Sequence, residues 1–180
     1  LEPEPGCAIE RLDGLAMFFE RHLLCGDDER VRRYLRACVD CCHAAVMFED
    51  FEHGIEALDA RSIGIGRVQV SSALDVDMDR DPDATRAALE AFRDPRWLHQ
   101  VMVRDDGNER FHEDLGPALE QETRGHWRIH FHVPVHLDAL GPLGTTQAQL
   151  IEAIDVLQAR DEPLDWEVET YAWSALPAPL

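Results

Sequence analysis

An α/β fold with parallel strands is the fold class that this sequence predicts. Short β-like runs alternate with helical patterns along the 180 residues, and this alternation is typical of βα units around a parallel sheet. Each expected strand has one apolar and one polar face, whereas central strands of an open parallel sheet are apolar on both faces. Half-polar parallel strands fit a (βα)₈ barrel (a TIM barrel) better, because polar side chains near the strand ends converge on a site at its top. An antiparallel sheet with one wet face is the alternative, which the intervening helices disfavour.

The helices are predicted from apolar residues at helical spacing and from capping residues at their N-termini. Asp81 and Pro82, for example, supply an Asp N-cap followed by Pro at the first helical position. In chain order, the expected helices span 8–24, Asp27 or Asp28 to Tyr34, 44–60, 81–92, 114–121, and Thr145 or Thr146 to about Arg160.

The strands are predicted from short runs in which apolar and polar residues alternate. They span 1–5, 37–42, 66–72, 127–135 and 165–173. Two further β-like runs, 97–104 and 109–112, flank the turn sequence 105–108, Asp-Asp-Gly-Asn, which is typical of a β-hairpin. The hairpin is expected as an insertion near 97–112.

The composition excludes several function classes. Every one of the 17 basic residues is arginine, so Schiff-base and Walker-lysine chemistry are excluded. The net charge of −19 argues against a nucleic-acid partner, because phosphate binding needs clustered Lys and Arg. We see neither a signal peptide nor a membrane-spanning apolar stretch. Five cysteines, an odd number that includes the adjacent Cys41 and Cys42, do not make a secreted disulfide framework, so we expect a cytoplasmic protein.

The polar faces of the strands combine carboxylates, imidazoles and an amide. These side chains belong to Glu2, Asp40, His43, Gln69, His130, His132 and Glu169. Buried carboxylates are costly without a cation, and a divalent metal ion is the natural counter-charge on strands that lack Lys. Oxygen ligands favour Mg²⁺ or Mn²⁺, whereas added imidazole admits Zn²⁺, Fe²⁺ or Co²⁺.

Five short motifs, in this order and spacing, resemble the xylose isomerase-like TIM-barrel superfamily, which includes sugar isomerases, epimerases and endonuclease IV-type proteins. The motifs are Leu1-Glu2-Pro3-Glu4-Pro5-Gly6, Val39-Asp40-Cys41-Cys42-His43-Ala44, Val68-Gln69-Val70-Ser71-Ser72, Ile129-His130-Phe131-His132-Val133-Pro134 and Glu167-Val168-Glu169-Thr170. More narrowly, the runs at 98–100, 141–147 and 167–171 resemble EboE, the metabolite-traffic family of Ebo gene clusters.

The resemblance implies a set of metal ligands and catalytic groups. The ligand positions of the superfamily match Glu2, Asp40, Gln69 and Glu169 here, and His132 resembles a further ligand of the endonuclease branch. Glu2 and Glu169 would act as the catalytic acid and base, and His43 would contact substrate. One departure is Gln69, where the superfamily usually has His.

Other positions keep two interpretations. His130 is expected to contact substrate or to be a satisfied core histidine. Gly144 and Thr145 precede a helix that could bind an anionic group of the substrate, and a plain loop with a Thr N-cap is the alternative. Glu4 is expected beside the metal ligands or at the surface. Cys38 and Cys41 are expected to be free core cysteines, because positions three apart on a strand point to opposite faces.

The resemblance also bears on length and function. A full barrel has about 250 residues, so we expect residues 1–180 to be a C-terminal portion with about five strands, or a barrel trimmed at both ends. The expected function is a metal-dependent isomerase or epimerase of a small sugar-like or polyhydroxylated metabolite. A non-catalytic protein for metabolite binding or trafficking is the alternative, motivated by Gln69, and an endonuclease IV-like phosphodiesterase is weakened by the negative charge. Whether the chain forms a homo-oligomer stays open.

Overall fold

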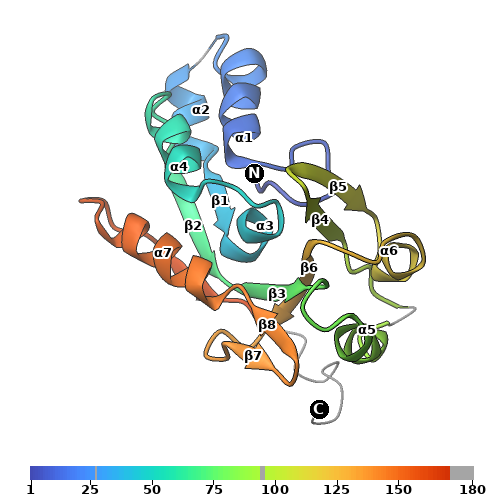
Figure 1. Ribbon diagram of the computed structural model, residues 1–180. Helices are drawn as coiled ribbons and strands as arrows, with labels where there is room; N and C mark the ends of the chain where they lie inside the picture. Colours follow the sequence, from blue (N-terminus) through green and yellow to red (C-terminus); the bar gives the residue numbers. More distant parts are fainter. Residues whose placement is uncertain (27, 94–95, 171–180) are drawn as a thin grey trace.

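The structure, a computed structural model, describes residues 1–26, 28–93 and 96–170 and divides their strands between two sheets (Figure 1). One sheet is parallel and has the strand order β1-β2-β9. The other is antiparallel and has the order β5-β4-β6-β3-β8-β7. The chain passes from the first sheet to the second at Ser71, between β2 and β3.

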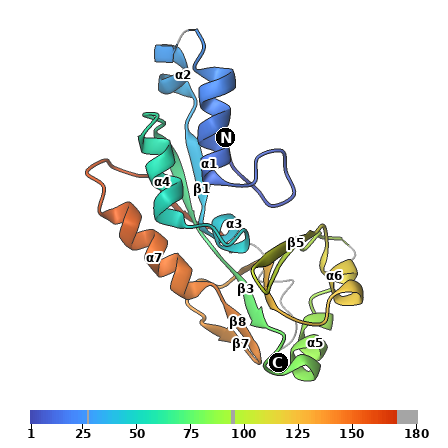
Figure 2. The ribbon, with the colours of Figure 1, turned by 45° about the horizontal axis from the view of Figure 1, so that its top comes forward.

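The parallel sheet is small and is packed against helices. Its strands are β1 (Ala37–Asp40), β2 (Ile65–Val70) and β9 (Trp166–Val168). The helices of this half are α1 (Leu12–Phe18), continued by a π-helical segment (Phe19–Leu23), α2 (Asp28–Tyr34), α4 (Phe51–Asp59) and α7 (Gln147–Gln158). Helix α4 packs between α1 and α7 (Figure 2). The shared core includes Leu15, Val39, Leu58, Val68 and Leu150.

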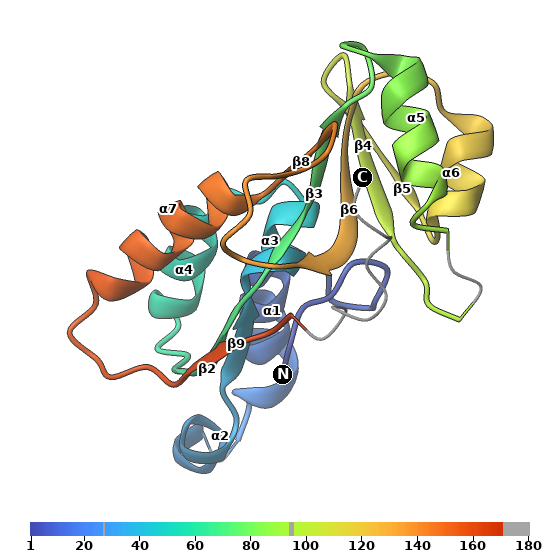
Figure 3. The same cartoon turned by 90° about the horizontal axis from the view of Figure 1, so that it is seen from below.

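The antiparallel sheet has its own apolar core. Its strands are β3 (Ser72–Asp77), β4 (Val101–Asp105), β5 (Asn108–His112), β6 (His126–Val133), β7 (Ala139–Leu140) and β8 (Leu143–Thr145). One face is covered by α5 (Pro82–Glu90) and α6 (Leu115–Gln121) (Figure 3). Alternate residues of β6, namely Trp127, Ile129, Phe131 and Val133, belong to the core on this face.

Helix α3 (Cys41–Val46) packs on the opposite face, against β3 and β6. Arg128 of β6 shows the contact directly, because its Nη1 donates to the Ala45 carbonyl at 2.7 Å. The helix begins directly after β1, with Asp40 as its N-cap. The polar face of β6 is therefore covered by α3.

The expectation of a (βα)₈ barrel is wrong for the described residues, whose strands do not close into a barrel. The parallel register is limited to β1, β2 and β9, and β6 runs antiparallel between β4 and β3. The half-polar character of β6 has a different origin from the one expected: its apolar face packs on α5 and α6, and its polar face lies against α3. The antiparallel alternative describes this half of the chain.

Several elements also differ in their bounds. Residues 1–5 form no strand, although Leu1 O accepts from Cys38 N at 2.7 Å. The expected helix 44–60 is split by Phe48, whose φ of 51° is left-handed, and β3, β7 and β8 were not expected. The β4–β5 hairpin forms around a turn in which Asp106 and Gly107 have positive φ. The end of the last expected strand, 171–173, lies outside the described residues.

The five cysteines are free thiols. Cys38 lies on β1, whereas Cys41 is the first residue of α3. Within the described ranges, no helix has both the length and the apolar composition needed to cross a bilayer.

Glu49 links α1 to the loop that follows α3. Its Oε2 accepts the backbone N–H of Leu12 at 3.0 Å, at the first residue of α1, where Arg11 makes no side-chain cap. Burial raises the pKa of Glu49 to about 7, and the Leu12 N–H opposes this rise. The folded chain therefore holds more protons than the unfolded chain between about pH 4.5 and 7, so this carboxyl lowers stability as pH rises through that window.

Glu49→Gln is expected to weaken this pH dependence, since the amide keeps an acceptor for Leu12 but does not ionise. Between pH 5 and pH 8, the stability of the variant relative to the parent chain should increase by on the order of 1–3 kcal/mol. Urea unfolding at both pH values measures the difference, with the exposed Glu52→Gln as the matched control. Equal pH dependence in the parent and in Glu49→Gln would contradict this role.

Candidate metal centre

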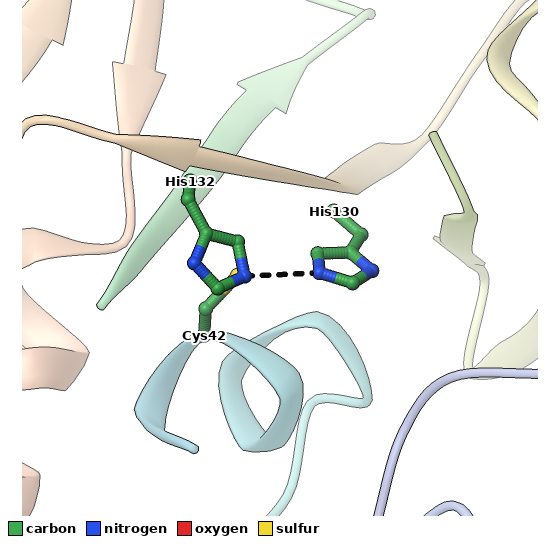
Figure 4. A group of neighbouring side chains, drawn as sticks. All are labelled: Cys42, His130 and His132. Carbon is green, nitrogen blue, oxygen red and sulfur yellow. Dashed lines mark hydrogen bonds between the residues drawn. The ribbon is translucent and has the colours of Figure 1, made fainter. Parts of the chain in front are cut away.

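His130 brings its Nε2 atom into contact with those of His43 and His132, between α3 and β6. His43 lies on the first turn of α3. His130 and His132 are two residues apart on the polar face of β6 (Figure 4). The Nε2 atom of His130 is 3.2 Å from that of His43 and 3.0 Å from that of His132. The Nε2 atom of His130 therefore contacts the Nε2 atoms of both other histidines.

The other ring nitrogens fix the protonation of these histidines. Each Nδ1 faces a carbonyl oxygen: Pro3 O for His43 at 3.0 Å, Gln100 Oε1 for His130 at 2.9 Å and Glu169 O for His132 at 3.2 Å. A carbonyl oxygen only accepts, so each Nδ1 carries the proton and donates it. The Gln100 orientation is supported by its Nε2, which donates to Pro5 O at 3.4 Å.

In the neutral rings, each Nε2 therefore presents a lone pair. A proton shared between two of them would make one ring cationic, and burial opposes that charge at His130. Burial, followed by His43 and His132, lowers the pKa of His130 well below its ordinary value. Lone pairs that face one another in a buried place favour a cation other than a proton.

Asp40 adds an unpaired carboxylate oxygen to the same place. Its Oδ1 accepts from His43 N at 2.9 Å and from Ser71 Oγ at 2.7 Å. Its Oδ2 is 3.9 Å from His43 Nε2, the side chain is wholly inaccessible, and no donor among the described residues reaches that oxygen. A buried carboxylate oxygen without a partner is costly, and a cation at the Nε2 atoms would satisfy it.

These side chains fit a metal ion. Three overlapping groups each bring their ligand atoms within 4.8 Å of one another: Asp40, His43 and His132; Cys42, His130 and His132; and Glu4, His43 and His130. Asp40 and His132 are thus placed among residues that could hold a metal ion, as the sequence predicts. His43 and His130, expected to contact substrate, are placed with them.

Sequence reasoning missed Cys42 as a member of the group. The strand was expected to run through residue 42, whereas β1 ends at Asp40 and α3 begins at Cys41. The helical start turns Cys42 toward β6. The signal that could have found it is Asp40 itself, since Asp before a helical pattern is a typical N-cap.

Glu2 and Glu169 flank the histidines instead of lying at the Nε2 atoms. Glu2 Oε1 is 3.4 Å from His43 Nδ1, and Glu169 Oε1 is 3.9 Å from His132 Nδ1. Burial raises the pKa of both carboxyls, with opposing contributions from His43 at Glu2 and from His132 at Glu169, while Asp40 raises both further. Both are therefore poised to hold a proton at higher pH than an ordinary Glu.

Gln69 is engaged by two neighbours. Its Nε2 donates to Glu169 Oε2, and its Oε1 accepts from Cys38 Sγ at 3.2 Å. It belongs to none of the three groups of described side chains that could hold a metal ion. Its amide orients Glu169 across the β2–β9 pair.

Gly144 and Thr145 lie in β8, which β3 separates from β6. Thr145 Oγ1 donates to Leu137 O at 2.7 Å. A Cβ on Gly144 would come within 2.7 Å of Asp75 O, so the close approach of two strands explains this glycine. The structure thus places both residues in sheet pairing, apart from the histidines.

No protein-family model, no curated protein and no solved structure matches this chain. Its function is therefore inferred from its own side-chain geometry.

Proposed function

We propose that this chain binds a divalent metal ion through His43, His130, His132 and Asp40, and acts there on a small sugar-like or polyhydroxylated metabolite as an isomerase or epimerase. The observation that carries the proposal is the contact of His130 Nε2 with the Nε2 atoms of His43 and His132, beside the unpaired Asp40 Oδ2. A bound divalent ion would supply a Lewis acid that polarises a substrate oxygen.

The two flanking glutamates are suited to the proton transfer that such a reaction needs. Isomerisation or epimerisation removes a proton from carbon and returns one to carbon, so it needs a base that becomes an acid. Burial raises the pKa of Glu2 and of Glu169, which brings a carboxyl closer to the working range of a general base. In this proposal one carboxylate accepts the substrate proton, and the carboxylic acid then returns it.

The histidine Nδ1 donors have a positioning role. The Pro3 and Glu169 carbonyls belong to the same segments as Glu2 and Glu169. Each hydrogen bond therefore holds one imidazole and one catalytic carboxyl at a fixed separation. Such partners of a ligating His orient the ring and increase its basicity.

A metabolite-binding or trafficking role without turnover is the second candidate. The observation that favours it is the hydrogen bond from Gln69 Nε2 to Glu169 Oε2. A donor on the carboxylate stabilises its charged form and occupies a lone pair that a substrate proton would need. Binding would then persist without proton transfer.

Solvent-deuterium exchange separates the two candidates. The chain, loaded with Zn²⁺ or Mn²⁺, is incubated with a panel of ketoses in D₂O, and deuterium at carbon is measured by mass spectrometry. Isomerase activity predicts metal-dependent incorporation that falls by about 10²- to 10⁴-fold in Glu169→Gln. The matched control is Glu167→Gln, two residues earlier on β9, whose carboxylate pairs with Arg67.

Retained exchange in Glu169→Gln would contradict the role of Glu169. Ketose binding with no exchange in the parent chain would contradict the isomerase and support the trafficking role. Equilibrium dialysis with the same ketoses measures that binding.

Gln100→Leu is expected to weaken metal binding although residue 100 is not a ligand. The change removes the acceptor that fixes the proton on His130 Nδ1, and loss of such a partner costs about 10- to 100-fold in metal affinity. Competition with a chromophoric chelator, with Zn²⁺ as the probe ion, measures the change. Gln121→Leu, at the exposed end of α6, should bind like the parent chain, and equal affinity in Gln100→Leu would argue against the tautomer assignment.

A further inference from the structure

Cys42 is the only thiol that the described structure places among the grouped ligand atoms. Its side chain is fully buried, on the first turn of α3 beside His43. The Sγ atom lies within 4.8 Å of ring nitrogens of His130 and His132 (Figure 4). A thiol in this position faces the lone pairs that the histidines present.

We infer that Cys42 is a thiolate ligand of the proposed metal centre, and that it makes the centre selective for a thiophilic divalent ion such as Zn²⁺ over Mg²⁺. This inference rests on the proposed metal-binding function. Imidazole and thiolate together suit Zn²⁺ and Co²⁺, whereas Mg²⁺ prefers oxygen ligands and retains its waters. On binding, the S–H bond breaks, a metal–sulfur bond forms, and the proton passes to the solvent without any redox change.

Hydrogen bonds hold the helical turn that carries Cys42 beside Asp40. Burial, followed by the charge of Asp40, raises the pKa of the Cys42 thiol well above its ordinary value, and a backbone hydrogen bond with Phe131 opposes this rise. The thiolate therefore forms only when a cation binds to the sulfur. Cys42 N donates to Ser71 Oγ at 2.9 Å, and the same hydroxyl donates to Asp40 Oδ1 at 2.7 Å. One serine therefore fixes both the thiol-bearing turn and the carboxylate, which is the kind of outer support that positions metal ligands.

The neighbouring Cys41 provides a matched control. It is also buried and also lies on the first turn of α3, but it packs in the core of the parallel sheet with Val39 and Val68. Cys42 instead packs with Val46, Met47, Ala73 and Met102. The two thiols are thus equal in chemistry and differ in the side of α3 that they occupy.

Cobalt spectroscopy tests the inference. Co²⁺ is added to the metal-free full chain, and absorption is recorded in the visible and near-ultraviolet ranges. The parent chain and Cys41→Ser should both show visible ligand-field bands and a near-ultraviolet thiolate-to-cobalt charge-transfer band. Cys42→Ser should keep the visible bands and lose the charge-transfer band, and its affinity for Zn²⁺ relative to Mg²⁺ should fall.

The outcomes separate this inference from the proposed function. Visible bands without a charge-transfer band in the parent chain overturn the thiolate ligand and leave the histidine centre standing. A charge-transfer band that persists in Cys42→Ser also overturns it. Failure of the parent chain to bind Co²⁺ overturns both. Because the parent spectrum alone decides the first outcome, the test holds even if circular dichroism shows that Cys42→Ser does not fold.

Discussion

Replacement of His132 by alanine is expected to lower the affinity of the chain for Zn²⁺ by more than about 100-fold, since loss of an outer partner alone costs up to about that much. His132 belongs to two of the three groups of side chains that could hold a metal ion. One of these groups contains Asp40 and the other contains Cys42. Loss of His132 therefore removes a ring nitrogen from both of these groups. Competition with a chromophoric chelator measures the affinity.

Two further variants make this result specific. Asp40→Asn keeps the shape of the side chain and removes the charge of the unpaired Oδ2, so it should also weaken binding by at least about tenfold. His136→Ala removes an exposed histidine four residues further along the chain and should bind like the parent. Parent-like affinity in His132→Ala would mean that the ion binds elsewhere.

Trp127→Ala is expected to destabilise the chain by about 3–5 kcal/mol, the range for truncating a large aromatic side chain in a core. Trp127 is among the largest fully buried side chains, at the centre of the antiparallel sheet, and packs with the helices α5 and α6. Its indole Nε1 also donates to Arg124 O at 2.8 Å. Urea unfolding monitored by circular dichroism measures the loss.

Trp166→Ala is the matched control for this change. Trp166 lies on β9 with 41% of its surface exposed, so its removal should cost clearly less stability than removal of the fully buried Trp127. A small loss in Trp127→Ala would contradict the packing of the apolar face of β6 against α5 and α6.

The elements that the sequence predicts well have local signals. Asp81 accepts from Ala84 N at 3.2 Å and Pro82 opens α5, and the left-handed Gly107 turns the hairpin. The direction of a strand has no such signal, because alternating side chains look the same in parallel and antiparallel pairing. The orientation of β6 depends on its pairing with β3 and β4, which are distant in sequence, and for this reason the barrel expectation failed.

In the candidate site, too, the features with a local sequence signal were predicted and those that depend on tertiary contacts were not. Period-two alternation correctly places His130 and His132 on one face of a strand. Asp40 and His43 lie close together because the side chain of an N-cap residue accepts from the backbone N–H three residues later, here that of His43. The positions of Glu2 and Gln69 could not be predicted from such local patterns. Glu2 lies beside His43 Nδ1 and Gln69 donates to Glu169, and these partners are distant in the sequence and meet only in the tertiary structure.

X-ray absorption at the zinc edge tests the central claim most directly, because it reports the atoms around the ion. The chain is loaded with one equivalent of Zn²⁺ and freed of excess metal. Nitrogen neighbours at about 2.0–2.1 Å, with the outer scattering of imidazole rings, are the expected result. A zinc ion surrounded by oxygen alone, or a chain that retains no zinc, would contradict a metal centre built on His43, His130 and His132.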